Sequence, residues 1–540
     1  MPINSVLYFH PEGFSTSSDK LMGRHAAGEG FLRGWVRHSQ VDKLVCCGEN
    51  SKHAGYLAAM AKDFGWTGSV HWINVASPRP LANVGNLFLP GPGLDSWAWT
   101  RRGAGSQRDF SIVGVTHTTA SGSAMDNIGK LLASPVQEWD ALICTSMAVR
   151  TMVLDLLATQ ADFLGSRFGV PQGHKYVVPQ LPVIPLGVET DAFAENPALR
   201  EGWRRELGIA EQDCVVLFMG RLSFHAKAHP VPMYMALQAA CDALPDGARL
   251  HLIEAGWFAN KEVREAYAAA AAHHCPRVVR HVLDGREARV RHGIWQAADI
   301  FCSLSDNIQE TFGLTPVEAM AAALPCVVSD WDGYKETVRH GIDGFRIRTW
   351  LPPASTGQDL AHRHAMGVDN YDHYSGKTCQ FVAVDPFAAA DAFRVLIADP
   401  GLRRRMGDAA RVRARESFDW RTVIGQYQSL FAELKSRREA APESAPLPAG
   451  APHWPLRPDP FRSFAGYPSQ PLTPDTRVVP VPGTDRAMLD RLCADPMVRY
   501  ATEILPPPDL LDRILVHLAT EGECRLEQLI RLFDDRHARI

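Results

Sequence analysis

Three features are scarce in this chain of 540 residues. No apolar run reaches the length of a membrane-spanning helix, so we expect no transmembrane segment. The first ten residues predict a strand, and they lack the basic region and apolar core of a signal peptide. Positive charge is not in excess either. The net charge of -4 gives no general case for nucleic acid as a partner.

Paired cysteines are also missing. The eleven cysteines are odd in number and include no C-x-x-C pair and no metal-ligand spacing. Several of them, such as Cys46, Cys144, Cys302 and Cys326, lie in apolar runs, where a cysteine behaves as a small buried hydrophobic residue. We therefore expect free thiols and a reducing compartment, namely the cytoplasm.

The sequence does have an ordinary globular composition and a regular alternation of elements. Hydrophobic residues make up 46% and charged residues 21%, and the length allows two or three domains with sizeable cores. Short apolar runs alternate with helical segments, which predicts an α/β fold with doubly wound parallel sheets. The expected strands are Ser5–His10, Lys43–Cys47, His71–Ile73, Asn86–Leu89, Phe110–His117 and Trp139–Ser146, then Cys214–Met219, Leu250–Glu254, Val278–Leu283, Ala298–Leu304 and Cys326–Ser329.

One stretch of the second half combines a strand, a glycine turn, a helix and a second strand. The strand Ala298–Leu304 leads into a polar loop, Gly313 and a helix that opens at Thr315 and Pro316. We expect Thr315 to cap this helix and Pro316 to take its first position. A helix start at the edge of a parallel sheet offers free N–H groups and partial positive charge. Glycine lets a phosphate come close, so the stretch predicts an anion site.

Glu310 and Glu318 flank this turn, eight residues apart. Both are expected to point into one crevice, where two carboxylates would accept hydrogen bonds from neutral hydroxyl groups such as those of a sugar and a ribose. Each glutamate also has a purely structural interpretation. Glu318 fits the S/T-x-x-E capping box with Thr315, and Glu310 fits a solvated loop acid.

The run Glu310-Thr-Phe-Gly-Leu-Thr-Pro-Val-Glu318 resembles the paired-glutamate signature of the retaining glycosyltransferases of family four. The resemblance implies the GT-B fold, in which two Rossmann-like domains face a cleft. It also implies that Glu310 lies beside the donor sugar, that Glu318 binds the ribose hydroxyls, and that the backbone of Gly313-Leu314-Thr315 holds the diphosphate. Thr311 and Phe312, inside the signature, are assigned to the same donor site.

Two cationic residues follow the end of the predicted strand Cys214–Met219. Five consecutive apolar residues precede Gly220, and Arg221 and Lys227 follow it. Two cations there would stabilise the charge that grows on a diphosphate leaving group, whereas solvated loop cations are the alternative. The family has the same glycine–arginine strand end. Here, however, the lysine lies one residue further on, and Ala228 replaces the usual glycine. The resemblance places the donor base near Leu283.

The first half offers further candidates. The glycine-rich segment Pro11–Gly34 does not have the spacing of the dinucleotide fingerprint, so no nicotinamide cofactor is expected. In the family this loop approaches the donor phosphates, which makes Gly23 and Arg24 candidates; a flexible connection with a surface arginine is the alternative. His117 ends a predicted strand at the ligand edge. The resemblance places it near the reacting sugar, although a lone histidine is more often structural.

The resemblance covers most of residues 1–436. We expect an acceptor-side domain at 1–187 and a nucleotide-sugar-binding domain at 188–436. An insertion near 350–378 contains three histidines whose spacing is not specific for a metal. The resemblance implies neither a metal nor a cofactor.

Residues beyond 436 differ in composition. Residues 437–483 are dense in proline and alanine, which predicts an extended linker. Residues 484–540 predict a helical appendage that is compatible with a small winged-helix-like unit. This tail mixes acids and bases without a basic stripe. We therefore expect it to pack or to bind a protein partner in preference to DNA.

The expected function is transfer of a hexosyl group, with retention, from a nucleotide-diphosphate sugar to a hydroxyl acceptor such as a glycan or a lipid-linked saccharide. Arg221 and Lys227 would stabilise the diphosphate, Glu310 would orient the sugar and His117 would contact it. Two alternatives stay open. One is a non-catalytic regulator that binds nucleotide sugars, and the other is an epimerase or phosphorylase of the same fold. The donor, the acceptor and the oligomeric state are not predicted.

Overall fold

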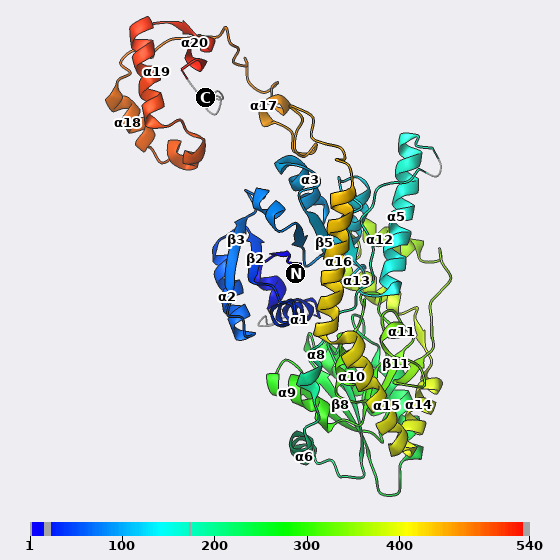
Figure 1. Cartoon of the computed structure of the whole chain (residues 1–540). Coiled ribbons are helices and arrows are strands. Elements are labelled where there is room, and N and C mark those ends of the chain that lie inside the picture. The colour runs from blue at the N-terminus through cyan, green and yellow to red at the C-terminus, as the bar shows by residue number, and fades with distance from the viewer. Residues whose placement is uncertain (1–2, 16–22, 172–173, 533–540) are drawn as a thin grey trace. The chain divides into compact units, whose positions relative to one another are not determined.

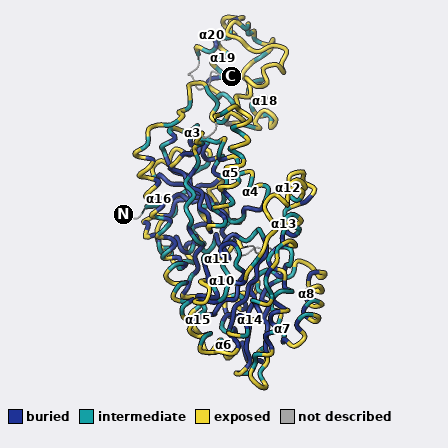
Figure 2. The backbone as a smooth tube through the Cα atoms, turned by 90° about the vertical axis from the view of Figure 1, so that its right-hand side faces the viewer, coloured by how far each residue is buried: buried dark blue, intermediate teal, exposed yellow. Residues whose placement is uncertain are grey.

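The computed structural model describes residues 3–15, 23–171 and 174–532 (Figure 1). The chain divides into two compact units, one that ends at Trp454 and one that begins at Pro455. The first unit contains two six-stranded sheets, and the second contains helices and a two-stranded ribbon. Figure 2 shows the buried residues concentrated in the first unit, whereas the second is mostly exposed.

The first sheet consists of parallel strands in the order β3-β2-β1-β4-β5-β6. The order reverses between β1 and β4, and in such sheets ligands bind at the carboxyl ends of the strands beside this switch point. The six strands predicted for this half are all present. They are β1 (Val6–Tyr8), β2 (Lys43–Gly48), β3 (Ser69–Asn74), β4 (Asn86–Phe88), β5 (Ser111–Val115) and β6 (Ala141–Ile143). The helices are α1 (Gly23–His38), α2 (Lys52–Asp63), α3 (Asp95–Ala104), α4 (Gly122–Gly129) and α5 (Met147–Phe168).

The second sheet repeats this arrangement, with parallel strands in the order β12-β11-β10-β7-β8-β9. Counted from its own first strand, its order equals that of the first sheet, so the unit contains two Rossmann-like domains. The strands are β7 (Cys214–Met219), β8 (Leu250–Gly256), β9 (Val279–Asp284), β10 (Ile300–Ser303), β11 (Cys326–Ser329) and β12 (Gly344–Ile347). The helices are α6 (Pro197–Glu206), α7 (Pro230–Ala240), α8 (Lys261–His274), α9 (Ala288–Gly293), α10 (Leu314–Ala321), α11 (Tyr334–Thr337), α14 (Pro386–Ala398) and α15 (Pro400–Arg413).

Strand β12 was not predicted. The segment Gly341–Phe345 is expected from its sequence to form turns, but Gly344 and Phe345 begin a strand that pairs with all four residues of β11. A glycine is needed at this start because a Cβ on Gly344 would lie 2.0 Å from the carbonyl oxygen of Cys326. The residue that looks like a turn signal therefore allows two strands to approach closely.

Helix α16 (Trp420–Ala440) follows the second sheet in sequence but packs in the first domain (Figure 1). Its buried side chains share one hydrophobic core with residues of α1, β1 and β2. Two glycines make room for Trp420: a Cβ on Gly34 would lie 2.8 Å from the indole, and one on Gly187 would lie 2.5 Å from it. The sequence boundary assigns residues 420–436 to the second domain, whereas their side chains complete the core of the first.

The insertion near 350–378 forms a helical hairpin. The ribbon of β13 (Thr349–Trp350) and β14 (Ala383–Val384) is antiparallel, and between its strands lie α12 (Gln358–Ala365) and α13 (Tyr371–Cys379). Asp369, in the turn between the helices, is buried and accepts hydrogen bonds from Arg363 at 2.8 Å and Lys377 at 2.6 Å. The α12–α13 hairpin (residues 358–379) is thus held closed at its turn.

The second unit contains α17 (Pro460–Ser463), α18 (Arg486–Ala494), α19 (Pro508–Glu521) and α20 (Leu526–Ile530), and β15 (Arg477–Val478) pairs antiparallel with β16 (Cys524–Arg525). Its core is small, with Leu518, Cys524 and Leu529 buried together. The helical character predicted for residues 484–540 is confirmed within the part that the structure describes. Strand β15 lies inside the predicted linker 437–483, so part of that linker belongs to this unit.

The described residues bear on two expectations from the sequence, which concern transmembrane segments and free thiols. Within them, no helix is long and apolar enough to cross a membrane. All eleven cysteines are free, and ten of them are buried. The buried ones include the four that were expected in apolar runs, Cys46, Cys144, Cys302 and Cys326.

Candidate active site

The predicted functional residues lie on loops that follow parallel strands. The loop after β5 carries His117. The loop after β7 (residues 220–229, the cationic loop) carries both predicted cations, and the loop after β10 (residues 304–313, the glutamate loop) carries Glu310. Ligands bind at the carboxyl ends of the strands in sheets of this kind. The candidate site is therefore the junction at which the carboxyl edges of the two sheets meet.

Gly313 shapes the turn between the glutamate loop and α10. Its φ of +86° is a left-handed conformation, and a Cβ there would lie 2.0 Å from the ring of Tyr334. Tyr334 is fully buried, and its hydroxyl lies 2.9 Å from Ser303 Oγ. Only glycine therefore lets the start of α10 lie against this ring.

Thr315 is not the helix cap that its sequence predicts. Helix α10 begins two residues earlier than predicted, at Leu314, with Gly313 in the N-cap position and no capping side chain. Pro316 consequently falls in the third helical position, where its missing N–H costs no intrahelical bond. The Thr315 hydroxyl is buried and has no hydrogen-bond partner among the described residues. A free hydroxyl beside free N–H groups suits a ligand that offers acceptor oxygens.

Lys227 of the cationic loop and Glu310 of the glutamate loop form an ion pair. Both side chains are largely buried, with 17% and 13% exposure. The lysine passes over Gly220, where a Cβ would lie 3.4 Å from its Cε. The structure thus brings two of the predicted catalytic side chains into direct contact.

The contact between Lys227 and Glu310 determines the charge state of both side chains. Burial opposes ionisation of Glu310, but the Lys227 ammonium and the backbone amides of Thr311 and Phe312 outweigh it and lower the pKa of the carboxyl. Burial likewise opposes the charge on Lys227, and the Glu310 carboxylate reverses this and raises the lysine pKa. A cation and an anion are therefore both present at neutral pH.

The cationic loop is tied to itself and to the glutamate loop. Arg221 donates a hydrogen bond to the carbonyl of Ala226 at 3.2 Å. Asn307 donates to the carbonyl of His225 at 2.7 Å. The first bond holds Arg221 against its own loop, and the second holds the cationic loop against the glutamate loop.

Glu318 lies in α10 and is half-buried. The capping box with Thr315 is absent because the helix starts earlier, so the purely structural interpretation of this glutamate is wrong. Burial raises the pKa of the carboxyl to about 7, against the opposing influence of Arg291 and Lys227. Such a carboxylate is suited to accept hydrogen bonds from ligand hydroxyl groups.

Thr311, the neighbour of Glu310, joins the two domains. Its hydroxyl donates to the carbonyl of His117 at 3.2 Å, and its own carbonyl accepts a hydrogen bond from Thr145 at 3.0 Å. His117 is therefore placed next to the glutamate loop, as the sequence predicts for a residue at the junction.

The start of α5 makes a second contact across the junction. Ser146 caps this helix and donates to Asp332 at 2.8 Å, and the N–H of Met147 donates to Glu336 at 2.6 Å. Burial raises the pKa of Asp332 to about 7, and the bond from Ser146 opposes that rise. Two acids of the second domain thus face the partly positive end of a first-domain helix.

The contacts described above do not include three predicted donor-site residues, namely Gly23, Arg24 and Leu283. Gly23 is exposed at the start of α1, and a Cβ there would meet no atom of the described residues within 4 Å. The side chain of Arg24, like residues 16–22, lies outside the described residues. Leu283 lies near the carboxyl end of β9 and packs against the core. Their roles stay predictions.

Sequence reasoning missed three residues of the junction. Tyr334 lies in the stretch Asp330–Glu336, whose sequence predicts turns and helix ends with a structural role. Asp306 is buried with one carboxylate oxygen unpaired, and burial raises its pKa to about 7. Its place on the loop between the predicted strand Ala298–Leu304 and Glu310 was the available signal. Tyr371 belongs to the α12–α13 hairpin, and nothing in its sequence surroundings points to the site.

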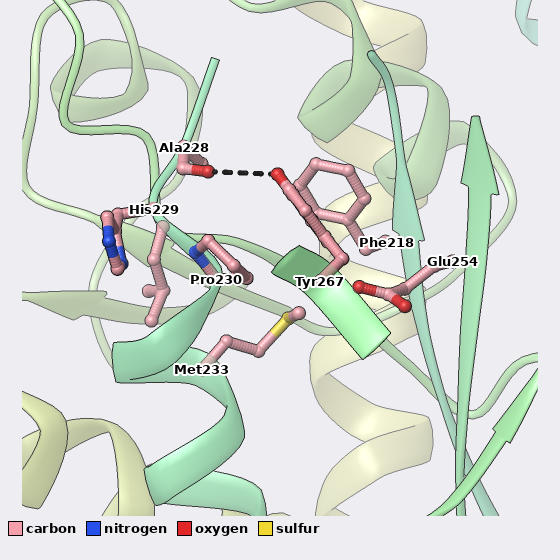
Figure 3. Close-up of a pocket in the computed structure, with 8 residues that line it drawn as sticks. Phe218, Ala228, His229, Pro230, Met233, Glu254 and Tyr267 are labelled. Atoms are coloured by element: carbon pink, nitrogen blue, oxygen red, sulfur yellow. Dashed lines mark hydrogen bonds between the residues drawn. The ribbon is translucent and has the colours of Figure 1, made fainter. Parts of the chain in front are cut away.

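A small cavity lies beside the cationic loop (Figure 3). Its volume is about 10 Å³, room for a single water molecule. Glu254 lines it and accepts a hydrogen bond from Tyr234 at 2.6 Å, and Tyr267 reaches the carbonyl of Ala228 at 3.5 Å. The cavity is a packing void that is too small for a nucleotide sugar. Among the described residues, no group of three or more His, Cys, Asp or Glu side chains is arranged to hold a metal ion.

Comparisons with known proteins find a family resemblance in part of the second domain. Residues 200–352 match the family model described as glycosyl transferases group 1. The D-inositol 3-phosphate glycosyltransferase of Xylanimonas cellulosilytica is 27% identical over 263 residues, which cover 48% of this chain and 52% of that protein. The phosphatidyl-myo-inositol mannosyltransferase of Mycobacterium tuberculosis is 27% identical over 248 residues, which cover 46% and 53%. The chain spans about half the length of these curated relatives.

The fold also has a solved counterpart. The structure of Anabaena HepE in complex with UDP superimposes with a TM-score of 0.51 at 16% sequence identity, covering 80% of this chain and all of HepE (100%). At that identity the likeness concerns the fold, and it agrees with the GT-B architecture of two Rossmann-like domains. The family match includes both the cationic loop and the glutamate loop. It therefore agrees with the resemblance that the paired glutamates carry, and it shows that residues 200–352 are similar to the glycosyl transferases group 1.

Proposed function

We propose that the protein is a retaining glycosyltransferase that moves a hexosyl group from a nucleotide-diphosphate sugar to a hydroxyl acceptor. The observation that carries this proposal is the buried ion pair of Lys227 and Glu310 beside the start of α10. A nucleotide-diphosphate sugar combines two chemistries. Its phosphates need cations and N–H donors, and its hydroxyl groups need acceptors. The junction offers both within one set of loops.

The leaving group determines the role of the cations. When the bond between the anomeric carbon and the phosphate oxygen breaks, the electron pair stays on that oxygen. Arg221 and Lys227 provide fixed positive charge for it in a partly buried site, where charge interactions are stronger than in water. The N–H groups at the start of α10 and the Thr315 hydroxyl are further donors to the same diphosphate. We propose no metal and no cofactor in addition.

The sugar and the acceptor meet on the face from which the diphosphate leaves. The acceptor oxygen forms the new bond to the anomeric carbon, and its proton passes to the departing phosphate oxygen. The configuration is thereby retained. Glu310 accepts hydrogen bonds from the sugar hydroxyls while Lys227 holds it in place, Glu318 holds the ribose hydroxyls, and His117 contacts the reacting sugar from the first domain.

The named relatives suggest which probes to use first. HepE was solved with UDP, and the names of two relatives specify inositol 3-phosphate and phosphatidyl-myo-inositol. We therefore propose UDP-sugars and GDP-mannose as the first donors and inositol-bearing acceptors as the first acceptors. The cytoplasmic location stays a prediction, which the eleven free cysteines support.

The test measures donor binding by thermal shift, and then release of nucleoside diphosphate, with UDP-, GDP- and ADP-sugars. A ligand that binds only the folded state raises the melting midpoint. Lys227→Ala and Arg221→Ala remove the predicted cations. Lys261→Ala is the matched control because Lys261 pairs with Glu265 at 3.4 Å on the exposed surface of the same domain. We expect one nucleotide class to stabilise the wild type and the control but neither site variant. Turnover of Arg221→Ala should fall about 100-fold.

Other outcomes would favour other functions. Binding without release of nucleoside diphosphate, with or without acceptor, would favour the regulator. Free sugar or its isomer, formed without acceptor, would favour an epimerase, and a requirement for inorganic phosphate would favour a phosphorylase. Full turnover by Arg221→Ala would show that the cationic loop does not stabilise the leaving group.

A further inference from the structure

The α12–α13 hairpin contacts two loops of the candidate site through one hydroxyl group. Tyr371, the first residue of α13, donates from its hydroxyl to Gln309 Oε1 at 3.0 Å. The same hydroxyl lies 3.4 Å from Thr118 Oγ1 of the first domain. Gln309 directly precedes Glu310, and Thr118 directly follows His117. Tyr371 thus joins the backbone neighbours of two predicted catalytic residues that lie in different domains.

Helix α13 also packs on the cationic loop. Gly376 lies against His225, where a Cβ would be 3.1 Å from the histidine Cβ. His225 stands two residues before Lys227. Arg221 is close as well, since its charge counters the rise in the pKa of Tyr371 that burial causes. One helix of the insertion therefore contacts all three loops that carry the predicted catalytic side chains.

The hairpin itself is braced. Asn370 caps α13 by accepting a hydrogen bond from the N–H of His373 at 2.9 Å. The ring of His364, on α12, stacks on Tyr374 with centroids 4.3 Å apart, and it lies against Gly122 at the start of α4. Figure 2 shows the hairpin beside α4 of the first domain. A braced element of this kind can hold the loops it touches in fixed positions.

We propose that Tyr371 is a positioning residue for group transfer and that the α12–α13 hairpin shields the reacting end of the site from water. This inference rests on the proposed function. Water competes with the acceptor when its oxygen bonds to the anomeric carbon, the bond to phosphate breaks and the proton passes to the leaving phosphate. Without the Tyr371 hydroxyl, the Gln309 amide oxygen loses its partner, and the glutamate loop keeps only the bonds of Thr311 to the first domain.

The experiment compares Tyr371→Phe with Tyr374→Phe. Tyr374 lies on the same helix, and its hydroxyl makes no hydrogen bond with the described residues, so it is a matched control. We expect Tyr371→Phe to keep its melting midpoint, to raise the donor KM several-fold and to lose about 10-fold in kcat, the equivalent of one hydrogen bond. The share of donor lost to hydrolysis should rise several-fold. The control should match the wild type in every measurement.

A double-mutant cycle with Gln309→Met tests whether Tyr371 acts on group transfer through Gln309. If Tyr371 acts through Gln309, the double variant should be no worse than either single variant. Additive losses would overturn the positioning role. Equal transfer rate and equal hydrolysis share in Tyr371→Phe and wild type would overturn the whole inference.

A binding measurement separates this inference from the proposed function. The Kd of UDP and of UDP-glucose, or of GDP and GDP-mannose, is measured for the wild type and Tyr371→Phe. We expect the variant to bind the free nucleotide normally and to lose several-fold in affinity for the sugar-bearing form, because Tyr371 adjoins Glu310 at the sugar end. If the variant loses affinity only for the sugar-bearing form but the wild type shows no turnover, only the proposed transfer reaction is refuted. Equal losses for both ligands, or none, would refute the role of Tyr371.

Discussion

At the scale of single residues, the two glutamates of one signature occupy opposite electrostatic surroundings. Lys227 and the backbone amides of Thr311 and Phe312 together outweigh burial at Glu310 and lower its pKa, whereas burial dominates at Glu318 and raises its pKa to about 7. The spacing of the pair predicted that both belong to one site. It did not predict this difference, because the lysine that causes it lies 83 residues away in the chain.

The pKa of Glu318 predicts a pH dependence of donor binding. The carboxylate, not the carboxylic acid, accepts hydrogen bonds from two ribose hydroxyls, and a pKa raised from 4.5 to about 7 means that the carboxylate forms only as the pH rises through 7. Between pH 6 and pH 8, donor affinity should therefore rise about tenfold in the wild type. Calorimetric titration across this range measures it.

Glu318→Gln should bind the donor weakly, with little change over the same pH range. Glu287→Gln, at an exposed position of the same domain, serves as the control and should keep the slope of the wild type. An unchanged slope in Glu318→Gln would assign the pH dependence to another group.

At the scale of elements, local sequence patterns predict most of the strands, but they do not predict the elements that depend on contacts between distant residues. Strands buried in parallel sheets are apolar runs, so eleven of the twelve main-sheet strands were visible in the sequence. Strand β12 begins at a glycine and was taken for a turn. The predicted start of α10 lies two residues too late because Thr315 and Gly313 both resemble caps, and the left-handed φ of Gly313 decides between them. Contacts of the α12–α13 hairpin join residues far apart in sequence, which local patterns do not encode.

Two glycines with similar backbone conformations provide a test of the turn before α10. Gly313 has φ +86° and a Cβ position 2.0 Å from the Tyr334 ring, whereas Gly341 has φ +77° and no atom within 4 Å of its Cβ position. Gly341→Ala should therefore cost about 1 kcal/mol of unfolding free energy, from backbone strain alone. Gly313→Ala should cost about 3 kcal/mol or more, because the ring must also move. Chemical denaturation measures both values. Equal costs would mean that the Tyr334 ring moves away from the new Cβ at no cost in free energy.

At the scale of the whole molecule, the two compact units have separate cores. The four larger hydrophobic clusters all lie before Trp454, and the second unit has its own small one. The second unit leaves large side chains exposed, such as Tyr500 at 92% and Met497 at 84%. These support a protein partner for residues 484–540, which stays a prediction.

Removal of the second unit should leave the first intact. We expect a chain that ends at Trp454 to keep the melting midpoint and the donor affinity of the full chain, because no side chain of clusters one to four is lost. A chain that ends at Arg413 removes α16 as well and should lose cooperative unfolding of the first domain. Thermal unfolding of the two truncated chains, followed by circular dichroism, measures both. A lower midpoint after the shorter deletion would show that the second unit supports the first.

The return of α16 to the first domain has a consequence for synthesis on the ribosome. A nascent chain that has emerged only as far as Gly187 has every strand of the first sheet, but the groove in which Trp420 packs stays open until more than two hundred further residues have been added. The second domain can close around its own sheet during that interval. The domain translated first is therefore the last to be completed, because its core needs a helix that is made after the second domain.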